Sequence, residues 1–267
     1  MIARILSALI LAPAALGLVC FAPEWALLLA VCVAGTICLY EYSRLTRAMG
    51  LAGQLWLQSA AFWFLVPGLR LNWLPAPALL ALPVLAAFLG AMWRKAPVRE
   101  RALGLIGDAL GLVYVTVGLY PVVAIRFDFG SEGIRWLLIL LAVTWAGDVA
   151  AMVAGKRFGR TPFAPVLSPK KTNEGALAGL AAGLAAALLL QRLAMSELPI
   201  LHVGAVALIT GAVGQLGDLA ESMLKRGAGV KDSSALIPGH GGVLDRIDSL
   251  MFGLPALYVY LSLLHRP

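Results

Sequence analysis

Charged side chains are scarce in this sequence, and their scarcity excludes most soluble folds. Only 13% of the 267 residues are Asp, Glu, Lys or Arg, whereas 61% are hydrophobic. A soluble domain has about 25% charged residues. The hydrophobic residues gather in nine stretches that reach or nearly reach the length of about 20 residues that a membrane helix needs, at 4–22, 24–40, 52–69, 74–93, 104–125, 135–155, 174–195, 199–219 and 249–264. We therefore expect an all-α, polytopic integral membrane protein with about nine transmembrane helices. Little chain is left for a soluble domain, so residues 1–267 are expected to form a single membrane domain.

Cysteine is also rare, and its positions exclude a metal site of the Cys-x-x-Cys type. Cys20, Cys32 and Cys38 all fall in the first two apolar stretches, where thiols are usually inert. The first stretch resembles a secretory signal peptide, because Arg4 precedes an apolar run. However, the run is long, Val19 stands where a lipoprotein signal has a small residue, and a second stretch follows at once. We expect a retained first helix.

Positive charge is distributed unevenly along the chain. The formal net charge of +7 could suggest nucleic acid as a partner, but 16 of the 21 Lys and Arg residues fall at the N-terminus or after the second, fourth, sixth and eighth stretches. Lys and Arg stay on the cytoplasmic side of membranes. The N-terminus is therefore expected inside and the C-terminus outside, in the cytoplasmic (inner) membrane, with no binding of nucleic acid.

The N-terminal half, residues 1–130, offers few candidate site residues. Its polar residues are expected in loops, such as 41–44 and the basic cluster 94–101, which is typical of a topology determinant and a contact for anionic lipids. Asp108 lies inside an apolar stretch, where both an interhelical hydrogen bond and a catalytic role are open. No internal repeat is evident, which disfavours a transporter built from inverted repeats.

The C-terminal half begins with a different pattern. Asp148 lies about two turns before the end of the sixth stretch. Ser168, Lys170, Lys171 and Thr172 come just before the seventh. Hydroxyls and lysines at a helix N-terminus favour phosphate, because the free amides and the helix dipole attract anions there. A helix cap next to topology-determining lysines is the alternative interpretation.

The eighth stretch ends in charged and hydroxyl side chains. Its glycines, spaced three apart over 211–217, allow close helix packing. Asp218, Glu221, Ser222 and Lys225 would share one face if the helix continues. A solvated helix end gives a similar pattern, but it does not require Asp218 so close to the apolar stretch. Ionisable groups beside a membrane are costly, so their default interpretation is a functional site.

A glycine-rich segment, 227–242, follows and ends in a Gly-His-Gly-Gly turn. Such a backbone can approach phosphate oxygens closely. Asp245 and Asp248 then open the last stretch at i and i+3. With Asp218 across a short loop they indicate a magnesium site, because Mg²⁺ prefers a few carboxylates together with waters and substrate phosphates.

These residues resemble the pattern of the phosphatidate cytidylyltransferase (CDP-diacylglycerol synthase) family. Every fixed residue type is in place over about 27 positions, in Ser222-x-x-Lys225-Arg226-x4-Lys231-Asp232 and then Pro238-x-His240-Gly241-Gly242-x-x-Asp245-Arg246-x-Asp248. The runs around Asp148, Ser168 and Asp218 also fit, so that the resemblance covers about residues 140–250 and makes 131–267 the catalytic half. Met152 and Asn173 stand where the family usually has tyrosine and often has tryptophan, which bears on substrate packing more than on the reaction.

The resemblance implies an enzyme of phospholipid biosynthesis that converts CTP and phosphatidate into CDP-diacylglycerol and pyrophosphate. A lipid phosphate oxygen would attack the α-phosphorus of CTP, a reaction that depends chiefly on positioning and charge neutralisation. Mg²⁺ is the expected cofactor, with a second metal ion left open. The expected partners are CTP, phosphatidate and membrane lipids, and a homodimer is also left open.

The resemblance also suggests roles for single residues. The catalytic set is Asp218, Lys225, Asp245 and Asp248, of which the three aspartates are the expected metal ligands. The substrate-binding set is Asp148, Ser168, Lys170, Lys171, Thr172, Ser222, Arg226, Lys231, His240, Gly241, Gly242 and Arg246. Lys225, Arg226 and Lys231 would hold the triphosphate, and Lys170 and Lys171 the lipid phosphate or the leaving pyrophosphate. Asp148 would be a second metal contact, a lysine partner or both, and His240 a loop organiser more than a proton acceptor.

Three other functions compete with this interpretation. A lipid or polyprenol kinase also needs a nucleotide and magnesium, but the sequence has no Gly-x4-Gly-Lys-Ser/Thr loop. A CDP-alcohol phosphatidyltransferase should show Asp-Gly-x-x-Ala-Arg followed by Gly-x3-Asp-x3-Asp, which is absent. An ion-coupled transporter would place acidic groups near the bilayer midplane, whereas most acidic groups here fall at expected cytoplasmic helix ends.

Overall fold

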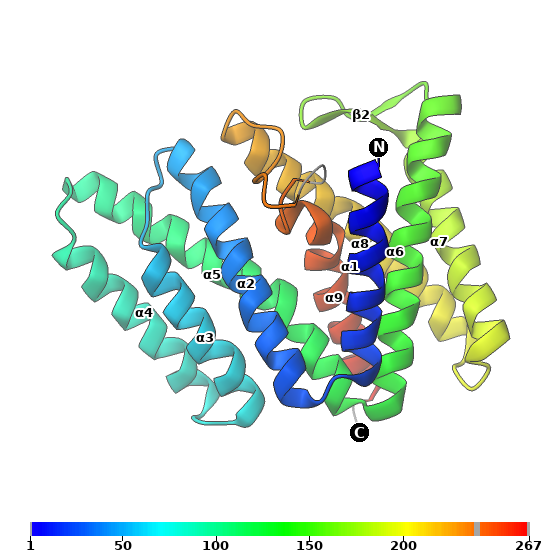
Figure 1. Ribbon diagram of the computed structural model, residues 1–267, viewed down its shortest axis with the longest axis horizontal. Helices are drawn as coiled ribbons and strands as arrows, with labels where there is room; N and C mark the ends of the chain where they lie inside the picture. Colours follow the sequence, from blue (N-terminus) through cyan, green and yellow to red (C-terminus); the bar gives the residue numbers. More distant parts are fainter. Residues whose placement is uncertain (1, 238–240, 266–267) are drawn as a thin grey trace. The chain divides into compact units, whose positions relative to one another are not determined.

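The computed structural model describes residues 2–237 and 241–265, and residues 2–11 by their backbone alone. The described chain forms nine helices and one short hairpin (Figure 1): α1 Ile2–Phe21, α2 Glu24–Ala48, α3 Leu55–Leu71, α4 Ala76–Trp93, α5 Val98–Asp128, α6 Gly130–Phe158, β1 Pro162–Ala164, β2 Ser168–Thr172, α7 Asn173–Ala194, α8 Ile200–Gly227 and α9 Leu244–Leu264. Each of the nine apolar stretches coincides with one helix.

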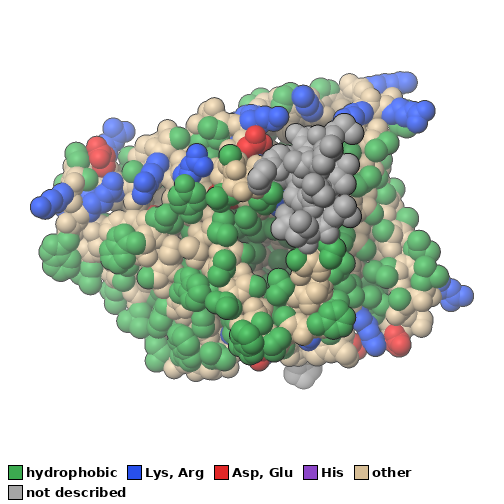
Figure 2. Space-filling model, in the orientation of Figure 1, with side chains coloured by type: hydrophobic (Ala, Val, Ile, Leu, Met, Phe, Trp, Pro, Cys, Tyr) green, Lys and Arg blue, Asp and Glu red, His purple; other side chains and the backbone are tan. Residues whose placement is uncertain are grey.

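Seven of the described helices, α2 and α4 to α9, are long and apolar enough to cross a membrane. Helix α3 has 17 residues, and α1 is described with its side chains only from Ala12. Figure 2 shows hydrophobic side chains over the visible face of α3 to α5, with Lys and Arg gathered where α4 joins α5. The lipid-facing side chains of α4 include exposed Leu85 and Phe88. These findings confirm an all-α polytopic membrane protein.

The chain divides into two compact units. The first consists of Met1–Val123 with Leu224–Ile247, and the second of Ala124–Met223 with Asp248–Pro267. Helices α8 and α9 each begin in one unit and end in the other. This division does not test whether the whole chain forms one membrane domain, which stays a prediction.

In the first unit, α2 extends beyond the expected stretch. Residues 41–44 are helical and lie within α2, so the prediction of a loop there was wrong. The helix continues because its polar side chains find partners inside the protein: Ser43 Oγ donates to Gln58 Oε1 at 3.1 Å, and Thr46 Oγ1 to the Tyr42 carbonyl at 3.2 Å. Glu41, Ser43 and Thr46 are therefore buried within the protein, whereas Arg44 and Arg47 of the same helix end stay exposed.

Asp108 of α5 joins neighbouring segments of the first unit. Its Oδ2 accepts the Gln54 amide at 2.7 Å, and its carbonyl accepts Gln58 Nε2 at 2.8 Å. Both partners lie at the start of α3. Of the two roles left open by the sequence, these contacts support the interhelical hydrogen bond.

In the second unit, glycines let helices approach closely. A Cβ on Gly179 of α7 would lie 3.0 Å from the carbonyl oxygen of Gly147 in α6. A Cβ on Gly217 of α8 would lie 2.6 Å from the carbonyl oxygen of Asp248 in α9. Larger side chains would push these helices apart, which confirms the packing role predicted for the glycines of 211–217.

The hairpin between α6 and α7 was not predicted, because its two strands are too short to give an alternating pattern. Pro162 pairs with Thr172 and Ala164 with Ser168. Thr172 also caps α7, since its Oγ1 accepts the Gly175 amide at 3.2 Å. The hairpin presents Lys170 and Lys171 at the start of α7.

Candidate active site

A cavity of about 690 Å³ opens in the second unit, within the range of about 300–1,000 Å³ typical of ligand sites. Four elements surround it: α6, the hairpin, α7 and α8. Its ionisable wall consists of Asp148, Lys156, Lys170, Lys171 and Asp218. The three cations can bind an anionic group, and the two carboxylates can bind a metal ion that accompanies that anion.

The apolar part of the same wall comes mainly from α6, the hairpin and α7. It includes Ala151, Met152, Phe163 and Ala176. Met152 is 53% exposed, and its neighbours Val149 and Val153 are exposed as well, so this side of α6 presents an apolar surface. A cavity with cations on one wall and apolar side chains on another suits a ligand with a charged head and an apolar body.

Asp218 lies on the cavity wall in contact with two predicted site residues. Its Oδ2 forms an ion pair with Lys171 Nζ, and its Oδ1 accepts Ser222 Oγ at 3.5 Å. The side chains of Lys171 and Asp218 are 30% and 29% exposed, so solvent screens the pair. Helix α8 continues to Gly227, as the shared face of Asp218, Ser222 and Lys225 requires.

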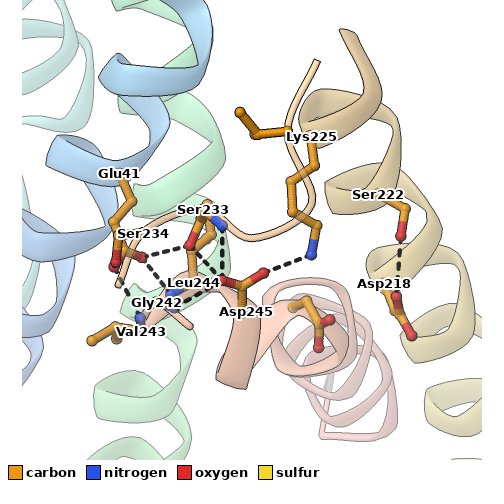
Figure 3. A network of polar contacts seen from close by, with 12 residues as sticks. Glu41, Asp218, Ser222, Lys225, Ser233, Ser234, Gly242, Val243, Leu244 and Asp245 are labelled. Carbon is orange, nitrogen blue, oxygen red and sulfur yellow. Dashed lines mark hydrogen bonds and ion pairs between the residues drawn. The ribbon is translucent and has the colours of Figure 1, made fainter. Parts of the chain in front are cut away.

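Asp245, at the start of α9, is the centre of a polar network in the first unit (Figure 3). Its Oδ1 accepts Lys225 Nζ at 2.6 Å. Its Oδ2 accepts the Ser233 amide, Ser233 Oγ and the Gly242 amide, each at 2.8 Å. The side chains of Asp245 and Lys225 are only 4% and 12% exposed. The network therefore fixes the segment before α9 against the end of α8.

The glycines of the Gly-His-Gly-Gly turn make this network possible. Gly241 has a φ of 81°, in the left-handed region that glycine adopts at low cost. A Cβ on Gly241 would lie 2.7 Å from Asp245 Oδ2, and one on Gly242 would clash with Ser233 Oγ and Glu41 Oε1. The backbone here closely approaches carboxylates of the protein itself. Its predicted approach to phosphate stays a prediction.

Glu41 is the main site residue that the sequence analysis missed. It belongs to α2, is fully buried, and accepts hydrogen bonds from Ser234 Oγ and the amides of Val243 and Leu244, with Ser233 Oγ 3.2 Å from its Oε2 (Figure 3). Ser233 and Ser234 were missed with it. A carboxylate near the end of an apolar stretch is a signal of function, but its partners stand about 200 positions away, and no local pattern links them.

The remaining predicted site residues have separate local contacts or are exposed. Asp248 Oδ1 accepts the Ser249 amide at 2.6 Å, and Ser168 begins β2. Arg226 donates to the Val230 carbonyl at 3.3 Å, while Lys231 and Arg246 are exposed. His240 lies outside the described residues. The roles predicted for these side chains stay predictions.

The carboxylates differ in how well they suit Mg²⁺. Asp218 presents partly exposed oxygens at a cavity wall that Asp148 also lines, which fits an ion that takes few protein ligands. Both oxygens of Asp245 are engaged by protein donors, so Lys225 would have to leave Oδ1 for direct contact. Among the residues that the structure describes, no group of three or more His, Cys, Asp or Glu side chains converges on one point.

Comparison with known proteins gives the family. Proteins named phosphatidate cytidylyltransferase from Bacillus subtilis (strain 168), Staphylococcus epidermidis (strain ATCC 12228 / FDA PCI 1200) and Staphylococcus aureus (strain COL) are 37%, 38% and 39% identical to this chain over 154, 152 and 152 residues. The aligned part covers 57–58% of this chain and 57% of each relative. The model of the cytidylyltransferase family matches residues 2–264. Because that match extends over nearly the whole sequence, the chain belongs to the cytidylyltransferase family.

Proposed function

We propose that this chain transfers CMP from CTP to phosphatidate and so forms CDP-diacylglycerol and pyrophosphate. The observation that carries the proposal is the 37–39% identity to proteins named phosphatidate cytidylyltransferase within a family match of residues 2–264. The cavity of the second unit supports a lipid substrate, because its cations stand beside an apolar wall.

The reaction needs one bond to form and one to break. A phosphate oxygen of phosphatidate attacks the α-phosphorus of CTP, and the bond from that phosphorus to the bridging oxygen of pyrophosphate breaks. The second phosphate pKa is about 6, so the nucleophile is largely an anion near neutral pH. It requires no strong general base, which agrees with a loop-organising role for His240.

The task of the protein is then to bind and orient two anions that repel each other. Lys170 and Lys171 would hold the lipid phosphate at the cavity wall, or the leaving pyrophosphate. Lys225, Arg226 and Lys231 would hold the triphosphate. Fixed cations at the positions where charge develops lower the barrier, because they need little reorganisation during the reaction.

Asp218, Asp245 and Asp248 are the proposed ligands of Mg²⁺, directly or through water, and Asp148 is a further candidate contact. The ion would supply charge neutralisation to the phosphates. Asp218 fits this role best, because its carboxylate lies partly exposed on the cavity wall.

The proposed location is the inner membrane, with the N-terminus and the polar segment 218–248 in the cytosol. The support is the asymmetry of Lys and Arg between alternate connections. Membrane lipids and a homodimer stay proposed partners. Light scattering of the purified protein in detergent would measure the oligomeric state.

Radiolabelled CTP tests the reaction. The purified chain in detergent is incubated with phosphatidate and Mg²⁺, and the lipid fraction is separated. Label at the α-phosphate is expected to enter lipid while pyrophosphate is released. Label entering lipid from the γ-phosphate would instead identify a lipid kinase. If neither label enters the lipid, the proposed function is refuted. A transporter is then the alternative function to test.

A further inference from the structure

Glu41 links two parts of the first unit that are far apart in the sequence. Its Oε1 accepts Ser234 Oγ at 2.6 Å and the Val243 amide at 3.0 Å. Its Oε2 accepts the Leu244 amide at 2.7 Å and lies 3.2 Å from Ser233 Oγ. The side chain comes from α2, so it anchors residues 233–237 and 241–243, which lie outside the helices.

Two of these donors are free amides at the start of α9. The first amides of a helix have no partner within the helix, and a negative charge there is favoured by the helix dipole. Glu41 therefore caps α9 from another helix. This contact fixes where α9 begins, and Asp245 lies in its first turn.

Ser233 connects Glu41 to Asp245. Its hydroxyl lies 2.8 Å from Asp245 Oδ2 and 3.2 Å from Glu41 Oε2, and its single proton can serve one carboxylate at a time. Movement of one carboxylate therefore changes the hydrogen bonding of the other. Through Asp245 Oδ1 the same chain of contacts reaches Lys225 Nζ.

We infer that Glu41 is a positioning residue that holds residues 233–234 and 243–244 and, through Ser233, the Lys225–Asp245 pair in the geometry that binds the nucleotide. The inference rests on the proposed function, which gives Lys225 and Lys231 to the triphosphate. Glu41 itself is buried among the residues it holds and would not touch the substrate. It would act by keeping the phosphate-binding cations in place before CTP arrives.

Glu41→Gln is the sharpest variant, because it preserves shape and removes charge. Whichever way the amide faces, its NH₂ group meets the backbone amide of Val243 or of Leu244, and neither can accept a hydrogen bond. Glu41→Asp keeps the charge on a shorter side chain and should recover part of the effect. Ser43→Ala is the matched control, since Ser43 is a buried polar residue of the same helix that bonds to Gln58 instead of the segment.

Two measurements on the full chain in detergent test the inference. Hydrogen–deuterium exchange should show amides in 233–237 and 241–244 exchanging about tenfold faster or more in Glu41→Gln. The KM for CTP should rise about ten- to hundredfold, as expected for losing hydrogen bonds to a charged group. The KM for phosphatidate should change much less, and Ser43→Ala should match the wild type in both measurements.

The failures of the two proposals can be told apart. A wild-type chain that makes no CDP-diacylglycerol overturns the proposed function. An active Glu41→Gln chain with unchanged exchange in 233–237 and 241–244, or with faster exchange and an unchanged KM for CTP, overturns the inference about Glu41. A uniform loss of kcat without a change in the KM for CTP does so as well.

Discussion

The buried pair of Lys225 and Asp245 gives the most direct prediction. In Asp245→Asn the side chain keeps its size but loses the charge that Lys225 Nζ contacts at 2.6 Å and that three further donors share. Removing one member of a buried ion pair costs about 3–5 kcal/mol. Since Lys225 retains some contact with solvent, we expect the lower end, about 3 kcal/mol.

A double-mutant cycle isolates the pair from the rest of the network. Lys225→Met leaves the carboxylate without its cation and should also destabilise the chain. The double variant leaves neither charge buried, so it should be more stable than the sum of the single effects by about 2 kcal/mol, within the range found for residues in contact. The assay is thermal or denaturant unfolding of the purified chain in detergent, followed by circular dichroism.

Glu197→Gln serves as the control, because Glu197 is exposed and its carboxylate lies 3.6 Å from the Arg135 guanidinium. Its effect should stay within about 0.5 kcal/mol. Single effects that add within about 0.5 kcal/mol would refute a coupled pair.

In the same preparations, Asp245→Ala is expected to abolish CTP-dependent turnover and still insert into the membrane. Substantial residual activity would contradict the role proposed for Asp245.

Three further predictions concern the turn, the cavity and the hairpin. Gly242→Ala should destabilise the chain by about 1–3 kcal/mol through overpacking, measured by unfolding in detergent, whereas Gly204→Ala, whose Cβ would lie 3.9 Å from its nearest neighbour, should be neutral or stabilising. Lys171→Met should raise the KM for phosphatidate in mixed micelles about tenfold, while Lys95→Met, on the connection before α5, should leave it unchanged. Glu174→Gln should speed amide exchange at residues 160–161, because the carboxylate accepts the amides of both residues. Unchanged exchange there would show that the hairpin is held by other contacts.

The helices were predictable because the length of an apolar run is set by the membrane. Their ends were not. The apolar pattern of α2 fades at residue 40, yet the helix continues to Ala48. Glu41 and Ser43 look like loop residues in the sequence, since their partners are supplied by other segments that a local pattern does not reveal.

The residues of the site were predictable in part, because charged side chains stand out in an apolar sequence. The sequence placed charged groups at helix ends, and the structure brings Asp148, Lys170, Lys171 and Asp218 to the wall of one cavity. The spacing of the motif did not predict that Asp245 would bond to Ser233 and Gly242, because those contacts depend on how the glycine turn folds back.

The anchoring of the segment 233–244 by Glu41 also has a consequence for biosynthesis. Glu41 emerges from the ribosome 192–203 residues before the groups that it binds. At about 5–20 residues per second, its carboxylate waits about 10–40 s for them. During that interval the carboxylate lacks the donors that later enclose it, so the first unit completes its interior only after residues 233–244 have been synthesised.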